Sequence, residues 1–295
     1  MRHVLQAAAA FSLTAALSVG VPTTARAASN WNGSGSSAGG TSTGCTSTII
    51  GGHLYRCTFD DEFSGSTLNT RVWVVQSGFA TGNPGAIACT VNDPRYINVS
   101  GGALHLIAAD TGTPYACGGT TTTYEAPTIS TYHTFSQQYG MFEVRTRNSV
   151  TPTLNEPGAH EAFWLWPDDR YSAINWPASG EIDVSETYSN YSNLSIPYLH
   201  YTANDNGGPI PGTNTAYNCV ATRGQWNTYD LIWTPTSITI NVNGATCLVN
   251  TSGDPAFRKP YLMMLSQALG AGTDAMTSTD ILPATTDVDY VRVWQ

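Results

Sequence analysis

The chain has 295 residues, enough for one large domain or two small ones. Its formal net charge is −9 with only 12 lysines and arginines, so it lacks the basic surface that nucleic acid or an anionic membrane would require. The 8 tryptophans and 15 tyrosines favour a neutral ligand such as a sugar, on which aromatic rings stack, although at least half of them are expected to pack in the core.

Residues 1–27 are typical of a secretory signal peptide. A polar start at Arg2 and His3 precedes an apolar run to about Val21, and "ARA" at 25–27 forms a cleavage site of the small-x-small type. A membrane anchor is the less favoured alternative, because the apolar run barely reaches spanning length and no basic cluster follows it. We therefore expect a secreted, extracellular protein with no membrane association after signal cleavage.

Residues 28–52 are rich in serine, glycine and threonine, which is typical of a flexible leader, and Cys45 could tie this leader to the rest of the chain. Six cysteines follow the signal without a CxxC pair or histidines at metal-ligand spacing, and in an exported protein this pattern favours disulfides over zinc. Sequence alone allows 15 pairings. Pairing between nearest neighbours would close short, local loops, and it would join Cys45–Cys57, Cys89–Cys117 and Cys219–Cys247.

Strand patterns dominate residues 53–295, which we expect to form one domain. The patterns are short, rich in β-branched and aromatic residues, and bounded by Gly, Pro, Asn or Asp. They lie at 102–110, 139–147, 160–167, 229–235, 237–244 and 288–295. Asn243 and Gly244 tolerate the positive φ of a type I′ turn and predict a hairpin. No long amphipathic helical pattern appears after the signal, so we expect an all-β sandwich of two large sheets.

Three carboxylates lie close together in "SGEIDVSETYS" (179–189), at Glu181, Asp183 and Glu186. On a regular strand Glu181 and Asp183 share one face, whereas strict alternation would bury the charge of Glu186. If one of the two residues between Asp183 and Glu186 is an insertion, Glu186 returns to that face, so the spacing predicts a β-bulge. Glycoside cleavage needs two carboxyl groups that flank the bond, and a third could raise the proton affinity of the acid. An exposed acidic face and a calcium site are the alternatives.

The segment "WPASGEIDVSE" (176–186) resembles the active-site strand of glycoside hydrolase family 16, in its bulged, laminarinase-like (endo-β-1,3-glucanase) branch. Other segments that resemble the family occur in its order, at 59–65, 101–108, 139–147, 161–167, 226–244 and 287–295. The resemblance implies a β-jelly-roll sandwich of two antiparallel sheets, concanavalin A-like, with a concave catalytic cleft. The catalytic domain would then be 53–295.

The activity implied by this resemblance is endo-acting hydrolysis of β-linked glucan, with β-1,3 or β-1,3/1,4 linkages. The reaction would retain the anomeric configuration through a covalent glycosyl-enzyme. A transglycosylase and a hydrolase of galactan or agar type on the same scaffold are alternatives. A non-catalytic glycan-binding module is a third, but such a module has no need of two glutamates flanking an aspartate.

The resemblance also implies roles for single residues. Glu181 would be the nucleophile, Glu186 the acid/base and Asp183 the assisting acid between them. The expected substrate contacts are Trp164, Trp176, His200 and Gln267. Two departures bear on the identity of the glycan. His160 and Glu161 stand where the family often has Trp-Pro, and Gln267 stands where it usually has Asn.

The expected partner is a polysaccharide, bound by a monomer, and no cofactor is expected for catalysis. The resemblance implies one possible structural calcium ion on the side away from the cleft. Asp289 matches the usual side-chain ligand, with backbone oxygens near Glu62 and Gly102 as its partners. The alternative is that Asp289 pairs with a neighbour such as Arg292.

Overall fold

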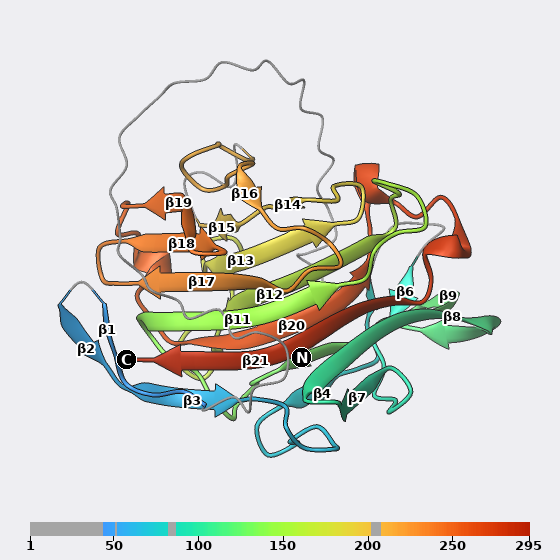
Figure 1. Cartoon of the computed structure of the whole chain (residues 1–295), viewed down its shortest axis with the longest axis horizontal. Helices are drawn as coiled ribbons and strands as arrows, with labels where there is room; N and C mark the ends of the chain where they lie inside the picture. Colours follow the sequence, from blue (N-terminus) through green and yellow to red (C-terminus); the bar gives the residue numbers. More distant parts are fainter. Residues whose placement is uncertain (1–43, 51, 82–86, 202–207) are drawn as a thin grey trace.

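The computed structural model of the protein describes residues 44–50, 52–81, 87–201 and 208–295. The predicted signal peptide and the first part of the predicted leader lie outside these residues. The described chain forms two large β-sheets, with two small two-stranded sheets beside them (Figure 1). None of the helical segments in these ranges has both the length and the hydrophobicity that a membrane span needs.

The six-stranded sheet runs in the order β15-β13-β12-β20-β10-β4. Its strands are β4 (Val74–Gln76), β10 (Thr128–Ser130), β12 (Ala159–Pro167), β13 (Glu181–Tyr188), β15 (Tyr198–His200) and β20 (Tyr261–Leu269). The neighbouring strands of this sheet are antiparallel.

The eleven-stranded sheet runs in the order β19-β18-β17-β11-β21-β8-β9-β6-β5, and in addition β3 pairs with β21 and β7 with β8. Its strands are β3 (Cys57–Asp61), β5 (Ala80–Thr81), β6 (Ala88–Cys89), β7 (Ile97–Ser100), β8 (Ala103–Cys117), β9 (Thr120–Glu125), β11 (Gly140–Asn148), β17 (Asn227–Trp233), β18 (Ile238–Val242), β19 (Ala245–Asn250) and β21 (Ala284–Trp294).

The remaining elements are short. They are the paired strands β1 (Thr48–Ile50) and β2 (His53–Tyr55), the paired strands β14 (Leu194–Ser195) and β16 (Cys219–Val220), and the 3₁₀ helices η2 (Pro255–Phe257), η3 (Gly272–Asp274) and η4 (Thr279–Ile281).

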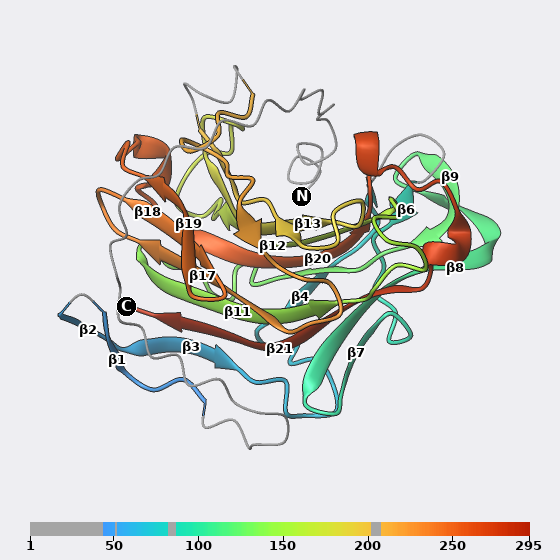
Figure 2. The same ribbon diagram turned by 45° about the horizontal axis from the view of Figure 1, so that its top comes forward.

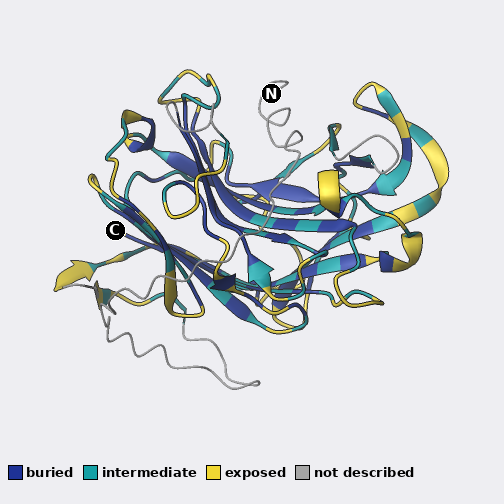
Figure 3. Cartoon of the chain, turned by 90° about the horizontal axis from the view of Figure 1, so that it is seen from above, coloured by how far each residue is buried: buried dark blue, intermediate teal, exposed yellow. Residues whose placement is uncertain are grey.

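The hydrophobic core fills the space between the two large sheets. Figure 2 shows them as two curved layers, with β12, β13 and β20 in one and β11 and β21 in the other, and Figure 3 shows buried residues in dark blue along the sheets. On β12, Phe163 and Leu165 belong to this core, whereas Trp164 and Trp166 pack in a separate cluster with Met264 of β20. Because alternate residues of a strand face opposite sides, the second cluster marks the side turned away from the core. We call that side of the six-stranded sheet the outer face.

The all-β sandwich predicted from the sequence is confirmed. The strands expected at 139–147 and 160–167 are β11 and β12. Asn243 and Gly244 form the two-residue turn between β18 and β19, with φ values of 52° and 76°. One pair departs from the expected antiparallel order, since β6 runs parallel to β9.

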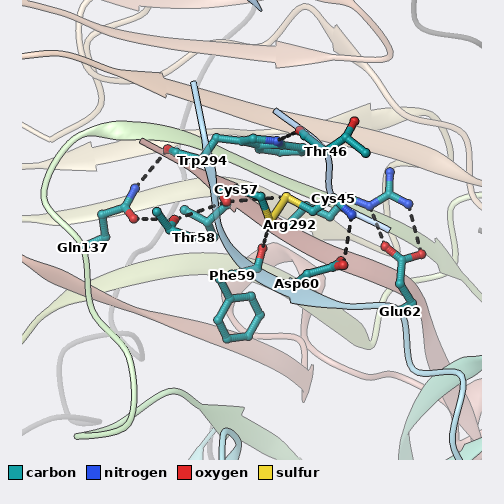
Figure 4. Close-up of a disulfide and its surroundings, with 11 residues drawn as sticks. Cys45, Thr46, Cys57, Thr58, Phe59, Asp60, Glu62, Gln137, Arg292 and Trp294 are labelled. Atoms are coloured by element: carbon teal, nitrogen blue, oxygen red, sulfur yellow. Dashed lines mark hydrogen bonds and ion pairs between the residues drawn. A yellow bond between two sulfur atoms is a disulfide. The ribbon is translucent and has the colours of Figure 1, made fainter. Parts of the chain in front are cut away.

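Three disulfides join the cysteines in the nearest-neighbour pairing, Cys45–Cys57, Cys89–Cys117 and Cys219–Cys247. Figure 4 shows the first of them, which ties the chain ahead of β1 to β3. Nearby, the indole N–H of Trp294 on β21 donates to the carbonyl oxygen of Thr46 at 2.7 Å. The last part of the predicted leader is therefore attached to the β domain through Cys45.

Gly180 fixes the point at which the chain enters β13, directly before Glu181. Its φ of +85° is a conformation that L side chains rarely adopt. A Cβ atom here would also collide with the hydroxyl group of Tyr261, which donates to the carbonyl oxygen of Ala256 at 2.9 Å. The entry to β13 therefore depends on both the backbone freedom and the small volume of glycine.

We predict that Gly180→Ala lowers the free energy of unfolding by about 3 kcal/mol or more, the sum of the positive-φ penalty and the overpacking against Tyr261. Gly119→Ala is the matched control, because Gly119 has a φ of +88° but no atom near its Cβ position, so it reports the backbone penalty alone. Urea unfolding of both variants measures the difference. Equal losses for the two substitutions would contradict the steric part of the argument.

Candidate active site

A β-bulge in β13 brings the three predicted carboxylates to one face. On β12, Phe163 pairs with Ser185 and the next residue, Trp164, pairs with Asp183, so Val184 has no partner across the strands. Val184 is fully buried in the core between the sheets. The predicted insertion is therefore confirmed at Val184, and Glu186 returns to the outer face with Glu181 and Asp183.

Glu181 lies at the start of β13 and is almost completely buried, with 4% of its surface exposed. The indole N–H of Trp176 donates to Glu181 Oε2 at 2.7 Å. Trp176 in turn packs against the outer-face aromatic cluster. The indole therefore holds one carboxyl oxygen of Glu181 in a fixed position.

Asp183 lies between the two glutamates and is 5% exposed. Its Oδ2 atom lies 3.3 Å from His200 Nε2, on the adjacent strand β15. The His200 ring packs against Trp176, with ring centroids 5.2 Å apart, and against Tyr198, at 4.1 Å. His200 is 6% exposed and contacts Asp183. Its expected contact with substrate remains a prediction.

Glu186 makes two contacts that the family resemblance did not provide. His160 Nε2 lies 3.1 Å from Glu186 Oε1, and the hydroxyl group of Tyr188 donates to the same oxygen at 2.8 Å. The rings of His160 and Tyr188 are stacked, with centroids 4.4 Å apart and planes 4° apart. His160 was noted only as a departure from the family pattern. Its alternation with Ala162 and Trp164 along β12 was the signal that could have placed it on the outer face.

Burial and mutual repulsion give the three carboxyl groups different proton affinities. Burial and the charge of Asp183 raise the pKa of Glu181 well above its usual range. Burial and the charge of Glu186 raise the pKa of Asp183 to about 6. Burial also acts to raise the pKa of Glu186, but the hydrogen bond and charge of His160 outweigh it and leave this pKa below its usual value. In the free site, Glu186 is therefore the most acidic of the three.

The two remaining predicted substrate contacts lie on opposite faces of the six-stranded sheet. Trp164 is on the outer face, where its indole N–H donates to Ser266 Oγ at 3.0 Å. Gln267 is fully buried, and its Oε1 atom accepts from the hydroxyl of Thr286 on β21 of the other sheet at 2.8 Å. In the structure Gln267 thus faces the core between the sheets, and its contact with substrate remains a prediction. Its neighbours Ser266 and Ala268 alternate onto the outer face in its place.

The predicted calcium ligand forms an ion pair instead. Asp289 Oδ2 lies 2.5 Å from Arg145 Nη1, and the carboxylate of Glu62 accepts two hydrogen bonds from Arg292, at 2.6 and 3.0 Å (Figure 4). A guanidinium group so close to Asp289 opposes a divalent cation, so these residues as placed do not fit a calcium site. The calcium ion stays a prediction from the resemblance.

Two clusters of described residues have carboxylate and imidazole atoms within 4.8 Å of one another and could hold a metal ion. One consists of His133, Asp168 and Asp169, and the other of Glu181, Asp183 and His200. In the first cluster Asp168 already accepts hydrogen bonds from Arg170 at 2.6 and 3.0 Å. In the second, the indole of Trp176 already donates to Glu181.

Two glutamates that flank an aspartate on one face of a curved sheet form the kind of site that hydrolyses glycosides. The sequence model of "Glycosyl hydrolases family 16" matches residues 88–292, more than half of the chain. The chain belongs to this family of glycoside hydrolases.

The names of similar proteins refer to different glycans. Keratan-sulfate endo-1,4-beta-galactosidase of Sphingobacterium multivorum is 32% identical over 181 residues, which cover 58% of this chain and 40% of that protein. Glucan endo-1,3-beta-glucosidase A1 of Niallia circulans is 25% identical over 267 residues, which cover 80% of this chain and 37% of that protein. The chain thus spans less than half the length of either relative.

The fold matches solved structures over nearly their whole length. The endo-beta-1,3-glucanase of Pyrococcus furiosus aligns with a TM-score of 0.71 and 21% identity, covering 85% of this chain and 98% of that one. At this level of identity the match supports the jelly-roll fold and leaves the substrate open.

A further buried carboxyl group, Asp274 on η3, lies close to the site. Its Oδ1 atom accepts from the backbone N–H of Asn190 at 2.8 Å, and its buried Oδ2 atom has no hydrogen-bond partner among the described residues. Burial, with a smaller contribution from the charge of Glu161, raises the pKa of Asp274 to about 7. The folded protein therefore keeps this group protonated at a pH where the unfolded chain has already lost the proton.

We predict that Asp274→Asn stabilises the protein at pH 8 and leaves its stability unchanged near pH 3.5. As pH rises from the unfolded pKa of about 3.9 through the folded value, ionisation of Asp274 costs the native state up to roughly 2–4 kcal/mol, and Asn avoids this cost. Urea unfolding at both pH values measures this difference in stability. Asp280→Asn is the control, because Asp280 is exposed on the neighbouring 3₁₀ helix η4. A gain of the same size at both pH values would show that ionisation is not the cause.

Proposed function

We propose that this protein is a secreted, monomeric, endo-acting hydrolase of β-linked glucan, with β-1,3 or mixed β-1,3/1,4 linkages. The observation that carries the proposal is the bulged strand β13, which holds Glu181, Asp183 and Glu186 on one face in a member of family 16. A relative that matches 80% of the chain is named a glucan endo-1,3-beta-glucosidase, which supports a glucan as substrate. Three disulfides support an oxidising compartment and therefore export.

In the proposed reaction Glu181 is the nucleophile and Glu186 the acid/base. Glu181 attacks the anomeric carbon while Glu186 gives its proton to the glycosidic oxygen, so the carbon–oxygen bond breaks and the leaving sugar departs as an alcohol. Glu186, now a carboxylate, then takes a proton from water as that water attacks the same carbon and releases Glu181. Two inversions at one carbon give net retention.

The neighbouring residues prepare Glu181 for attack. The indole of Trp176 fixes Oε2, so the carboxylate can turn only in ways that keep this hydrogen bond. Asp183 occupies the strand position between the glutamates, where an inverting enzyme would need room for a water molecule. The contact of His200 with Asp183 holds this central group in place. These positions support retention.

A galactan is the second candidate substrate, because the relative with 32% identity is named a keratan-sulfate endo-1,4-beta-galactosidase. Release of reducing sugar from laminarin, mixed-linkage glucan, agarose and keratan sulfate distinguishes the two substrate classes. Cleavage of laminarin or mixed-linkage glucan supports the proposal. Cleavage of galactans alone would replace glucan by galactan, and binding without any cleavage would favour a glycan-binding module.

We predict that Glu181→Gln and Glu186→Gln each lower glycan hydrolysis by about three orders of magnitude or more, because each removes a group that the reaction requires. The fold should persist, since both carboxyl groups are on the outer face and Gln has nearly the same shape. Reducing-sugar assays give the activity, and thermal unfolding gives the stability. Near-normal activity in either variant would refute the assignment of that residue.

We predict that the first-formed reducing ends of a β-glucan have the β configuration, because the glycosyl-enzyme on Glu181 is itself formed and broken by inversion. Proton NMR recorded before mutarotation distinguishes the two anomers. For Glu181→Ala with azide as external nucleophile, the product should have the α configuration. Early accumulation of α ends by the unaltered enzyme would refute both the mechanism and the position given to Asp183.

A further inference from the structure

The contacts of Glu186 are unequal on its two carboxylate oxygens. His160 and Tyr188 both contact Oε1, whereas Oε2 has no hydrogen-bond partner among the described residues. Two contacts on one oxygen fix the rotation of the carboxyl group about its terminal bond, a torsion that is otherwise broad. Since His160 lies on β12 and Tyr188 on β13, the orientation of Glu186 depends on two strands.

We propose that His160 is a positioning residue for the acid/base, which together with Tyr188 holds Oε1 and leaves Oε2 as the oxygen that exchanges the proton with the glycosidic oxygen. This inference rests on the role of Glu186 in the proposed function. His160 contacts no reacting atom in it and acts through Glu186. The stacking of its ring on Tyr188 keeps both donors directed at one oxygen.

Each proton that is given up in the reaction is accounted for when His160 has this role. In the first step the proton on Oε2 passes to the leaving oxygen, and the carboxylate that remains has Oε1 held by a protonated His160 and the hydroxyl of Tyr188. In the second step the proton of the attacking water returns to Oε2. His160 therefore stabilises the carboxylate that exists between the two steps, and it consumes no additional reactant.

The charges around His160 favour its protonated form. Burial acts to lower the pKa of His160, but the hydrogen bond and the charge of Glu186 raise it, with smaller contributions from Glu161 on the same strand and Asp274 on η3. Asp183 also lies close enough for its charge to interact with His160. The same pair interaction keeps the pKa of Glu186 low. Loss of the imidazole should therefore make Glu186 retain its proton to higher pH.

The first test compares His160→Gln and His160→Phe with the unaltered enzyme on whichever β-glycan that enzyme cleaves. Both variants should shift one limb of the bell-shaped pH profile of kcat/KM to higher pH, by roughly one pH unit, because both remove the cation beside Glu186. His160→Phe should lower kcat/KM at the optimum by roughly tenfold or more, and His160→Gln, which keeps a donor, should recover part of this loss. His105→Gln is the matched control, because His105 makes a comparable bond to Asp287 in the other sheet, at 2.7 Å.

A leaving group that needs no protonation separates positioning of the acid from general damage. The kcat/KM of an oligosaccharide with a 2,4-dinitrophenyl leaving group reports the first step without acid catalysis, so both His160 variants should leave it within about twofold of the unaltered enzyme. Tyr188→Phe keeps the stacked ring and should lower kcat/KM on the glycan while sparing that on the activated substrate. Equal losses on both substrates, or an unchanged pH profile, would overturn the proposal.

A measurement without substrate keeps the proposal testable if the proposed glucanase activity is wrong. Nitrogen NMR of the His160 imidazole, assigned from its absence in His160→Gln, gives its pKa in the resting protein. In Glu186→Gln this pKa should fall by about one unit or more, because the negative partner is gone. An unchanged value would show that the two groups do not interact, whatever the substrate. Inactivity of the unaltered enzyme on every glycan, together with this fall, would refute the proposed function alone.

Discussion

The insertion at Val184 is the constraint on which the site depends. A strand without it would direct Glu186 into the core, where an unpaired carboxylate is very costly. With Val184 and Ser185 both turned toward Phe163 and its neighbours, the strand returns to register and Glu186 opposes Ala162 on the outer face. One residue therefore converts an irregular spacing of acids into three carboxyl groups that can act on a single glycosidic bond.

The two residues of β12 that depart from the family pattern make charged contacts on opposite sides of the sheet. His160 points outward to Glu186, while Glu161 points inward, where Arg223 contacts its two carboxylate oxygens at 2.7 and 2.8 Å. Glu161 also accepts from the hydroxyl of Thr187, which adjoins Glu186 in β13. A buried, fully paired ion pair of this kind is weak evidence for added stability but strongly constrains geometry. It anchors β12 directly behind His160, the residue proposed to position Glu186.

The sequence was sufficient for the fold and for the three carboxylates, because both follow from local rules. Strand alternation and the Asn243–Gly244 turn depend on neighbouring residues, and so does the bulge, whose spacing is visible in the chain. The inward direction of Gln267 could not be predicted, because a match to a family position gives no information on which face of β20 it occupies. His160 was not assigned a role because its contact with Glu186 spans 26 positions in the sequence, and only the pairing of β12 with β13 brings the two together.

The order of proton affinities in the free site is the reverse of what the proposed reaction needs at its start. Glu181 must be ionised and Glu186 protonated, whereas burial raises the pKa of Glu181 and His160 lowers that of Glu186. The different solvent exposure of the two glutamates offers a way to reverse the order of their pKa values. Glu186 is only partly buried, whereas Glu181 is buried. A neutral sugar that covers the site removes more water from Glu186 than from Glu181, and desolvation raises the pKa of a carboxyl group. In the proposed reaction, substrate binding would therefore favour the protonated form of Glu186 over that of Glu181.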